Sequence, residues 1–150
     1  MKQFLILFFV GLTFAVSAQQ IDYNDNGKYI AKGYDVVAYF SGKTIAGNSR
    51  YIHSYNGTKF KFSNQTNLSK FKSNPKKHIP QYGGYCAYAM GKKGEKVSIN
   101  PKTFEIRNGK LYLFYNSYGT NTLTKWKKGN PTSLKAKADE NWIKLKFQKP

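Results

Sequence analysis

The chain has 150 residues and carries 25 lysines and arginines against seven aspartates and glutamates, which gives a formal net charge of +18. That length accommodates one domain rather than two, and a content of 40% hydrophobic and 17% aromatic residues excludes a wholly disordered chain. The single cysteine, Cys86, excludes an intramolecular disulfide framework and the cysteine-rich zinc and iron–sulfur modules.

The first residues have the three parts of a secretory signal peptide. Lys2 precedes an apolar run over residues 4–16, and the small residues Ser17 and Ala18 follow it. We therefore expect a signal peptide over residues 1–18 and an exported protein, periplasmic or extracellular, whose mature chain begins at Gln19. An uncleaved membrane anchor is the alternative, but the apolar run is short for a membrane span.

The positive charge suggests the kinds of partner that the protein meets outside the cytoplasm. There the available polyanions are lipid head groups, acidic glycans and acidic proteins, so we expect no nucleic-acid partner and a weak association with an anionic membrane surface. Only Arg50 and Arg107 are arginines, and the lysines are scattered along the chain. This pattern favours a solvated surface over a dedicated phosphate site, for which arginine is the better residue.

Residues 19–32 are polar and rich in glycine, asparagine and aspartate, so we expect a flexible lead-in before a single domain over residues 33–147. The domain opens with a short apolar run over residues 36–40, which Ser41-Gly42 ends. A run of this length predicts a buried β-strand.

Two Asn-Gly dipeptides, Asn56-Gly57 and Asn108-Gly109, predict two β-hairpins, because this dipeptide adopts the backbone conformation of a tight two-residue turn. The predicted arms are residues 51–55 and 59–62 in the first hairpin and residues 104–107 and 111–115 in the second. Phe60 and Phe62 alternate with lysines, so we expect one buried and one solvated face in the first hairpin.

Three segments predict helices by their capping residues and by the spacing of their apolar residues. The first begins near Ser63 or Asn64 and ends before Asn74-Pro75, and the second covers residues 122–128. The third begins at Asn130-Pro131 and carries Leu134, Ala138, Trp142 and Leu145 on one side. Hairpins mixed with helices, without a repeated β-helix-β pattern, predict an α+β fold.

The segment over residues 81–90 follows no regular pattern, and we place the candidate site there. Gly83 and Gly84 allow a close approach of the backbone to another group. A helical turn over residues 85–90 would put Cys86 near the helix N-terminus, where the helix dipole favours a thiolate. Candidate ligand-binding residues are Asp35, Tyr82, Gly83, Gly84 and Tyr85.

A thiolate is a soft ligand for copper(I) or zinc, and His53 and His78 are the two imidazoles of the chain. We therefore name Cys86, His53 and His78 as candidate metal ligands. Each candidate also has a structural interpretation. Cys86 can be a small buried hydrophobe, His53 a side chain on a hairpin face, His78 part of a basic run, and Asp35 a brace for its own loop.

Several stretches, in this order, resemble exported YHS-domain proteins. They are Gly-Tyr-Asp-Val-Val-Ala-Tyr-Phe at residues 33–40, residues 55–63, Phe71 with Asn74-Pro75, Pro-Gln-Tyr-Gly-Gly-Tyr-Cys-Ala at residues 80–87, and residues 138–142. The resemblance implies a small treble-clef-like core with a C-terminal helix, and a role in metal binding. Metal-binding versions carry a Phe-Cys-Ser-x-x-Cys-like run after the hairpin, and Ser63 and Asn67 stand at those cysteine positions here.

Three functions stay open at this point. The first is an exported protein that binds a copper or zinc ion through Cys86 and one or both histidines. The second is a module that binds an anionic or small-molecule ligand, without a metal, in a tyrosine-lined pocket near residues 82–90 of a basic surface. The third is an enzyme with Cys86 as nucleophile and a histidine as base, which we rank last because no catalytic signature surrounds Cys86.

Overall fold

The computed structural model describes residues 18–150, so the predicted signal peptide lies outside the described residues except for Ala18. Within residues 18–150 we find no helix with the length and apolar character that a membrane crossing requires. The helices are α1 (Gln65–Ser73), α2 (Pro75–His78), α3 (Ala87–Lys93), α4 (Thr122–Lys128) and α5 (Pro131–Leu145). Short 3₁₀ helices are η1 (Ile30–Gly33), η2 (Ala38–Ser41) and η3 (Gln81–Gly84).

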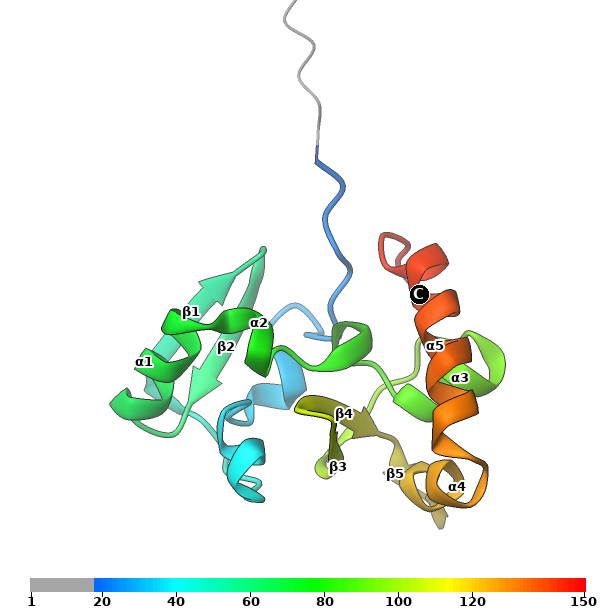
Figure 1. The fold of residues 1–150 in the computed structure, drawn as a ribbon. Coiled ribbons are helices and arrows are strands. Elements are labelled where there is room, and N and C mark those ends of the chain that lie inside the picture. Colours follow the sequence, from blue (N-terminus) through cyan, green and yellow to red (C-terminus); the bar gives the residue numbers. More distant parts are fainter. Residues whose placement is uncertain (1–17) are drawn as a thin grey trace, which may run out of the picture.

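The described strands form three antiparallel pairs: β1 (Asn48–Tyr55) with β2 (Thr58–Phe62), β3 (Asn100–Arg107) with β4 (Lys110–Phe114), and β5 (Asn116–Ser117) with β6 (Thr120–Asn121). Figure 1 shows the β1–β2 hairpin with α1 and α2 at one end of the molecule, β3 and β4 in the middle, and α3, α4 and α5 at the other end. The prediction of a small α+β domain is confirmed.

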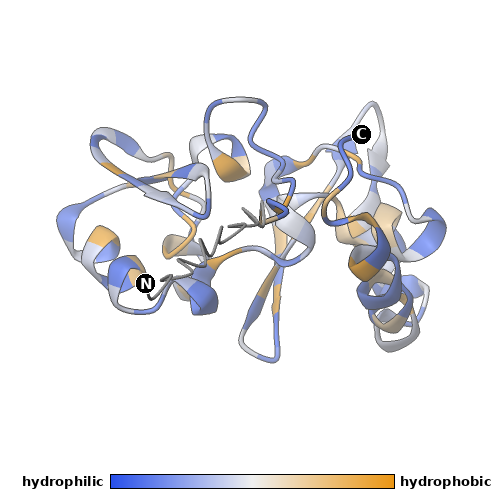
Figure 2. Cartoon of the chain, turned by 90° about the horizontal axis from the view of Figure 1, so that it is seen from above, coloured by the Kyte–Doolittle hydropathy of each residue, from blue (hydrophilic) through white to orange (hydrophobic). Residues whose placement is uncertain are grey.

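Strand β4 separates two hydrophobic clusters. Leu111 and Leu113 belong to the cluster that contains the β1–β2 hairpin, whereas Tyr112 and Phe114 belong to the cluster that contains Trp126. Successive strand residues point to opposite faces, so one strand supplies both clusters and its four apolar residues are all buried. Figure 2 shows hydrophobic stretches on the central hairpin and on helices at both ends, with hydrophilic stretches around them.

Turns and helix starts lie where local chemistry predicts them. Asn56 and Asn108 have positive φ and are each followed by a glycine with positive φ, as a tight hairpin turn requires. The side chains of Asn64, Asn121 and Asn130 accept backbone N–H groups at the first turns of α1, α4 and α5. Both predicted hairpins and all three predicted helices are confirmed.

The predicted strand over residues 36–40 is wrong, although its burial is correct. The carboxyl oxygen Oδ1 of Asp35 accepts the backbone N–H groups of Val37 at 2.9 Å and Ala38 at 3.3 Å. These bonds bend the chain into a turn that continues as η2, and they leave Val36 and Tyr39 fully buried. A short apolar run has the same composition in a buried turn as in a buried strand, so the sequence did not separate the two.

The segment that we expected to be a flexible lead-in is packed against the domain from Asp22 onward. The backbone of Asn24 donates to the Gly83 carbonyl at 2.8 Å, and its side chain donates to the Gly84 carbonyl at 2.9 Å. The backbone of Asp22 donates to the carbonyl of Lys146, beyond α5. Ile30 is fully buried in the first cluster, so this segment is part of the core.

Candidate functional site

Cys86 is fully buried and is the N-cap residue of α3. Its sulfur accepts the backbone N–H of Tyr115 at 3.3 Å and lies 3.3 Å from Oγ1 of Thr122. The Thr122 hydroxyl donates its hydrogen to the Tyr115 carbonyl at 2.7 Å, so the thiol is the donor in the contact between sulfur and hydroxyl. Cys86 thereby links the start of α3 to the residues that follow β4 and begin α4.

The two histidines lie beside Phe71. Their ring centroids lie 6.1 Å (His53) and 6.4 Å (His78) from that of Phe71. His78 is buried, and its Nδ1 lies 3.0 Å from the carbonyl oxygen of Asn74. Burial lowers the pKa of His78, and the bond to Asn74 opposes part of that effect.

The three candidate metal ligands do not form a joint site. Within the described part of the chain, no three or more side chains of histidine, cysteine, aspartate or glutamate gather closely enough to hold a metal ion. Ser63 and Asn67, at the positions of the cysteines in metal-binding YHS domains, instead donate to Oδ2 of Asp35 at 2.6 and 2.7 Å. Within residues 18–150, these side chains therefore form no copper or zinc centre of three or more such ligands.

Asp35, a candidate ligand-binding residue, is fully buried and holds two segments of the chain together. Its Oδ1 accepts the two backbone N–H groups of the turn that follows it. Its Oδ2 accepts the backbone and hydroxyl of Ser63 and the amide of Asn67. These bonds join the turn to the start of α1 and leave the carboxyl group facing the interior, in the bracing role that we weighed as the structural interpretation.

Gly83 and Gly84 allow a close approach, as their sequence predicts, but the group that approaches is the protein's own chain. A Cβ atom on Gly83 would lie 2.7 Å from the carbonyl oxygen of Asp22 and 2.7 Å from a ring carbon of Trp142. A Cβ atom on Gly84 would lie 3.2 Å from the side chain of Ile30. The two glycines thus let the N-terminal segment and α5 pack on η3.

The two candidate tyrosines of this segment donate to carboxylates inside the fold. The Tyr82 hydroxyl donates to Asp139 on α5 at 2.9 Å, and the Tyr85 hydroxyl donates to Asp22 at 2.7 Å. Burial is the main cause that raises the pKa of each phenol above the ordinary value for tyrosine, and the neighbouring carboxylate raises it further. Tyr82 and Tyr85 therefore fasten α5 and the N-terminal segment to η3 and to the residue that follows it.

A pocket of about 320 Å³ opens between α3 and α4. We call it the α3–α4 pocket. It is lined by Cys86, Tyr88, Ala89, Lys92, Lys93, Glu95, Val97, Tyr115, Thr122 and Lys125. Tyr88 and Val97 are partly buried, whereas the three lysines and Glu95 are exposed. The pocket therefore has an apolar interior and a mainly positive rim. Of its lining residues, Cys86, Tyr88 and Ala89 belong to the segment over residues 81–90 in which we predicted the site.

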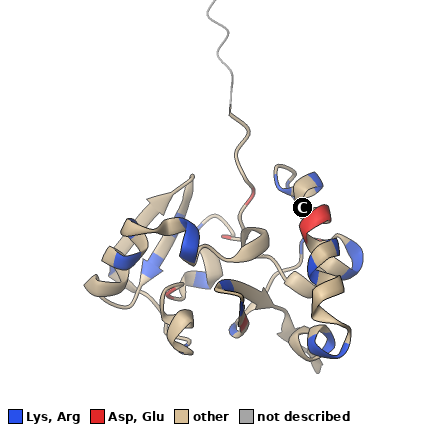
Figure 3. Cartoon of the chain, in the orientation of Figure 1, with Lys and Arg blue, Asp and Glu red and all other residues tan. Residues whose placement is uncertain are grey.

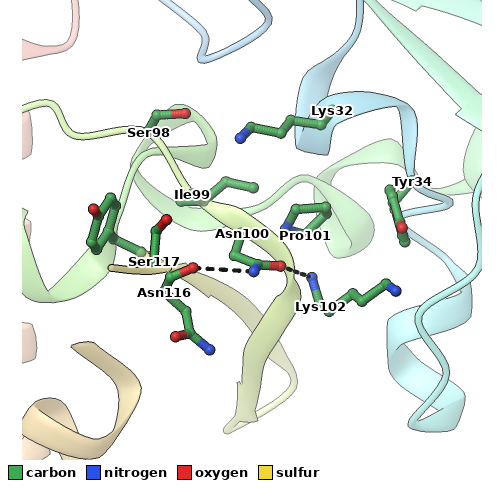
Figure 4. Close-up of a pocket in the computed structure, with 10 residues that line it drawn as sticks. Lys32, Tyr34, Ser98, Ile99, Asn100, Pro101, Lys102, Asn116 and Ser117 are labelled. Carbon is green, nitrogen blue, oxygen red and sulfur yellow. Dashed lines mark hydrogen bonds between the residues drawn. The ribbon is translucent and has the colours of Figure 1, made fainter. Parts of the chain in front are cut away.

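A second pocket of about 470 Å³ lies along β3. We call it the β3 pocket. Figure 4 shows its lining residues: Lys32, Tyr34, Ser98, Ile99, Asn100, Pro101, Lys102, Tyr115, Asn116 and Ser117. Its lining includes two lysines and no acidic residue, and Tyr115 lines both pockets. No local sequence pattern predicts this pocket, because its residues from η1, β3 and β5 meet only in the folded chain.

The comparisons with known proteins gave no match to a family model, to a curated protein or to a solved structure. The resemblance of residues 33–147 to exported YHS-domain proteins stays a prediction from their motifs. The α3–α4 pocket and the β3 pocket are the features of this chain from which we infer a function.

Proposed function

We propose that this protein is an exported binding module, rather than a metal carrier or an enzyme, and that its α3–α4 pocket binds a small organic anion with an apolar body. One observation carries the proposal: the interior of the pocket is apolar, and three lysines stand at its rim. A pocket of about 320 Å³ has the size of a site for a small molecule.

The interior of the pocket suits a hydrocarbon chain or ring. Tyr88, Val97 and Tyr115 offer aromatic and aliphatic surface, and removing such surface from water contributes roughly 25 cal/mol for each Å². The bonds from Cys86 to Tyr115 and Thr122 hold one wall in place before any ligand arrives. A wall that is already ordered loses little conformational entropy on binding.

The rim of the pocket suits a carboxylate. Lys92 and Lys93 come from the last turn of α3 and Lys125 comes from α4, against one acidic residue, Glu95. Figure 3 shows these basic stretches in blue on α3 and α4. Exposed charges interact weakly in water and are screened by salt. We therefore expect most of the affinity to come from the apolar interior, and the lysines to select an anion over a neutral ligand.

Calorimetric titration of residues 19–150 with octanoate and with 1-octanol tests the proposal. We expect octanoate to bind several-fold more tightly than octanol, and the difference to shrink as salt is added. Lys125→Ala should weaken octanoate binding several-fold. Lys127→Ala is the matched control, because Lys127 lies on the same helix and is exposed but does not line the pocket.

Two results would overturn the proposal. Equal affinities for octanoate and octanol would show that the lysines do not select an anion. Equal effects of Lys125→Ala and Lys127→Ala would show that any binding reflects the overall charge of the protein rather than the pocket.

A further inference from the structure

Two consecutive residues beside the β3 pocket have a strained backbone. Ala31 and Lys32 have φ values of 51° and 53°, in the left-handed region that residues other than glycine rarely adopt. Ala31 is fully buried beside Ile30, and its carbonyl oxygen accepts the backbone N–H of Tyr34 at 3.1 Å. The core and this bond hold the segment in its unfavourable conformation.

The burial of Ala31 does not explain why a lysine, rather than a glycine, stands at position 32. Lys32 is exposed, so a glycine at this position would keep the backbone path without the strain. The side chain of Lys32 instead lines the β3 pocket. Strained residues with no packing role are typical of functional sites, which points to a role for the Lys32 side chain in this pocket.

The other lining groups are arranged for a polar ligand with a negative charge. Lys102 comes from β3 and lies on the other side of Asn100 and Pro101 from Lys32 in Figure 4. The Asn100 side chain is fixed, because it donates to the Asn116 carbonyl at 3.1 Å and accepts the backbone N–H of Lys102 at 3.0 Å. Ser98 and Ser117 add hydroxyl groups, and no acidic residue opposes the two lysines within the lining.

Tyr34 and Tyr115 add aromatic surface to this polar lining. An aromatic ring covers the C–H face of a hydroxylated ring, while hydroxyl and amide groups bond its edges. We infer that the β3 pocket is a second binding site, distinct from the α3–α4 pocket, that takes a hydroxylated anion of the sugar-acid class, with its charge held by the lysines of the lining. This site does not depend on the proposed function of the α3–α4 pocket.

Titration of isotope-labelled protein, residues 19–150, with glucuronate, glucose and inorganic phosphate tests the inference by NMR. We expect glucuronate to shift the backbone amide signals of residues 98–100, 102 and 115–117, with an affinity at least fivefold above that of either other probe. Glucose has the ring without the charge, and phosphate has the charge without the ring. An affinity for phosphate equal to that for glucuronate would show that the pocket binds anions in general. An affinity for glucose equal to that for glucuronate would show that the lysines do not contribute to binding. Either result would overturn the inference.

Two variants test the role of Lys32 separately from the fold. Lys32→Gly should raise the melting temperature, because it relieves the strain, and should weaken glucuronate binding at least fivefold. Lys102→Ala should weaken binding to a similar extent. Lys43→Ala is the control, since Lys43 is exposed and does not line this pocket.

Unchanged glucuronate binding in both Lys32→Gly and Lys102→Ala would overturn the inference. A lower melting temperature in Lys32→Gly would contradict the account of the strain. Octanoate binding should stay the same in both variants, and its loss there would show that the two pockets are not distinct sites.

Discussion

The sulfur of Cys86 accepts the backbone N–H of Tyr115 at 3.3 Å, and Tyr115 lines both of the pockets that we propose as binding sites. The contact fastens the wall between the two pockets to the start of α3. The thiol gives its own hydrogen to Thr122 and is fully buried. Cys86 therefore joins the start of α3 to the wall that the two pockets share.

We expect the thiol of Cys86 to react with alkylating reagents only after denaturation, and its reactivity to be the same with and without Zn(II) or Cu(I). Cys86→Ala should lower the free energy of unfolding by about 1–3 kcal/mol, because it leaves a small cavity and an unpaired N–H at Tyr115. Thiol counting and urea denaturation measure the two effects. Rapid alkylation of the native protein that one equivalent of metal prevents would support the metal-binding interpretation instead.

Asp35→Ala should be among the most destabilising substitutions of a polar residue. Asp35 accepts five hydrogen bonds in the interior, and its removal takes the carboxylate acceptor away from the donors on Val37, Ser63 and Asn67. We expect a loss of about 3 kcal/mol or more in the free energy of unfolding. Glu140→Ala, at an exposed position on α5, is the control and should change stability by about 0.5 kcal/mol or less. Similar losses in the two variants would rule out the bracing role.

Gly83→Ala tests whether the glycine pair serves internal packing. The new methyl group would lie 2.7 Å from both the Asp22 carbonyl oxygen and the Trp142 ring, so we expect a loss above about 2 kcal/mol. Gly42→Ala is the matched control, since Gly42 also has a positive φ but has no heavy atom within 4 Å of a Cβ position. It should lose only about 1 kcal/mol. Equal melting temperatures for the two variants would contradict the close packing at Gly83.

His78 should make the stability of the protein depend on pH. Burial lowers its pKa below the ordinary value of 6.5, so between the two values the unfolded chain binds more protons than the folded one. Its contribution is thus fully present above pH 6.5 and is lost as the pH falls through the folded pKa. His78→Phe removes the titrating ring but keeps an aromatic side chain beside Phe40 and Phe71.

Chemical denaturation of both proteins at pH 7.5 and pH 5 measures this contribution. We expect the wild-type protein to lose more stability between the two pH values than His78→Phe loses. Equal losses would show that His78 titrates alike in the folded and unfolded chains.

The sequence predicted the elements whose signals are local. The Asn-Gly turns at Asn56 and Asn108 and the asparagine caps at Asn64, Asn121 and Asn130 depend on backbone groups within a few residues. Residues 36–40 show the limit of this reasoning. Their apolar character predicted burial correctly, but Asp35, whose other partners lie near residue 63, decided their backbone conformation.

The α+β class, both hairpins and the three capped helices follow from local sequence, because turn and cap bonds close within a short stretch of chain. The positions of the site residues depend instead on the packing of the whole fold. This packing placed Cys86 against Tyr115, 29 residues away, and placed the two histidines beside Phe71. It also brought Lys32 and Lys102 to one pocket. Contacts between distant segments depend on how the whole core packs, and no local spacing in a single sequence encodes that arrangement.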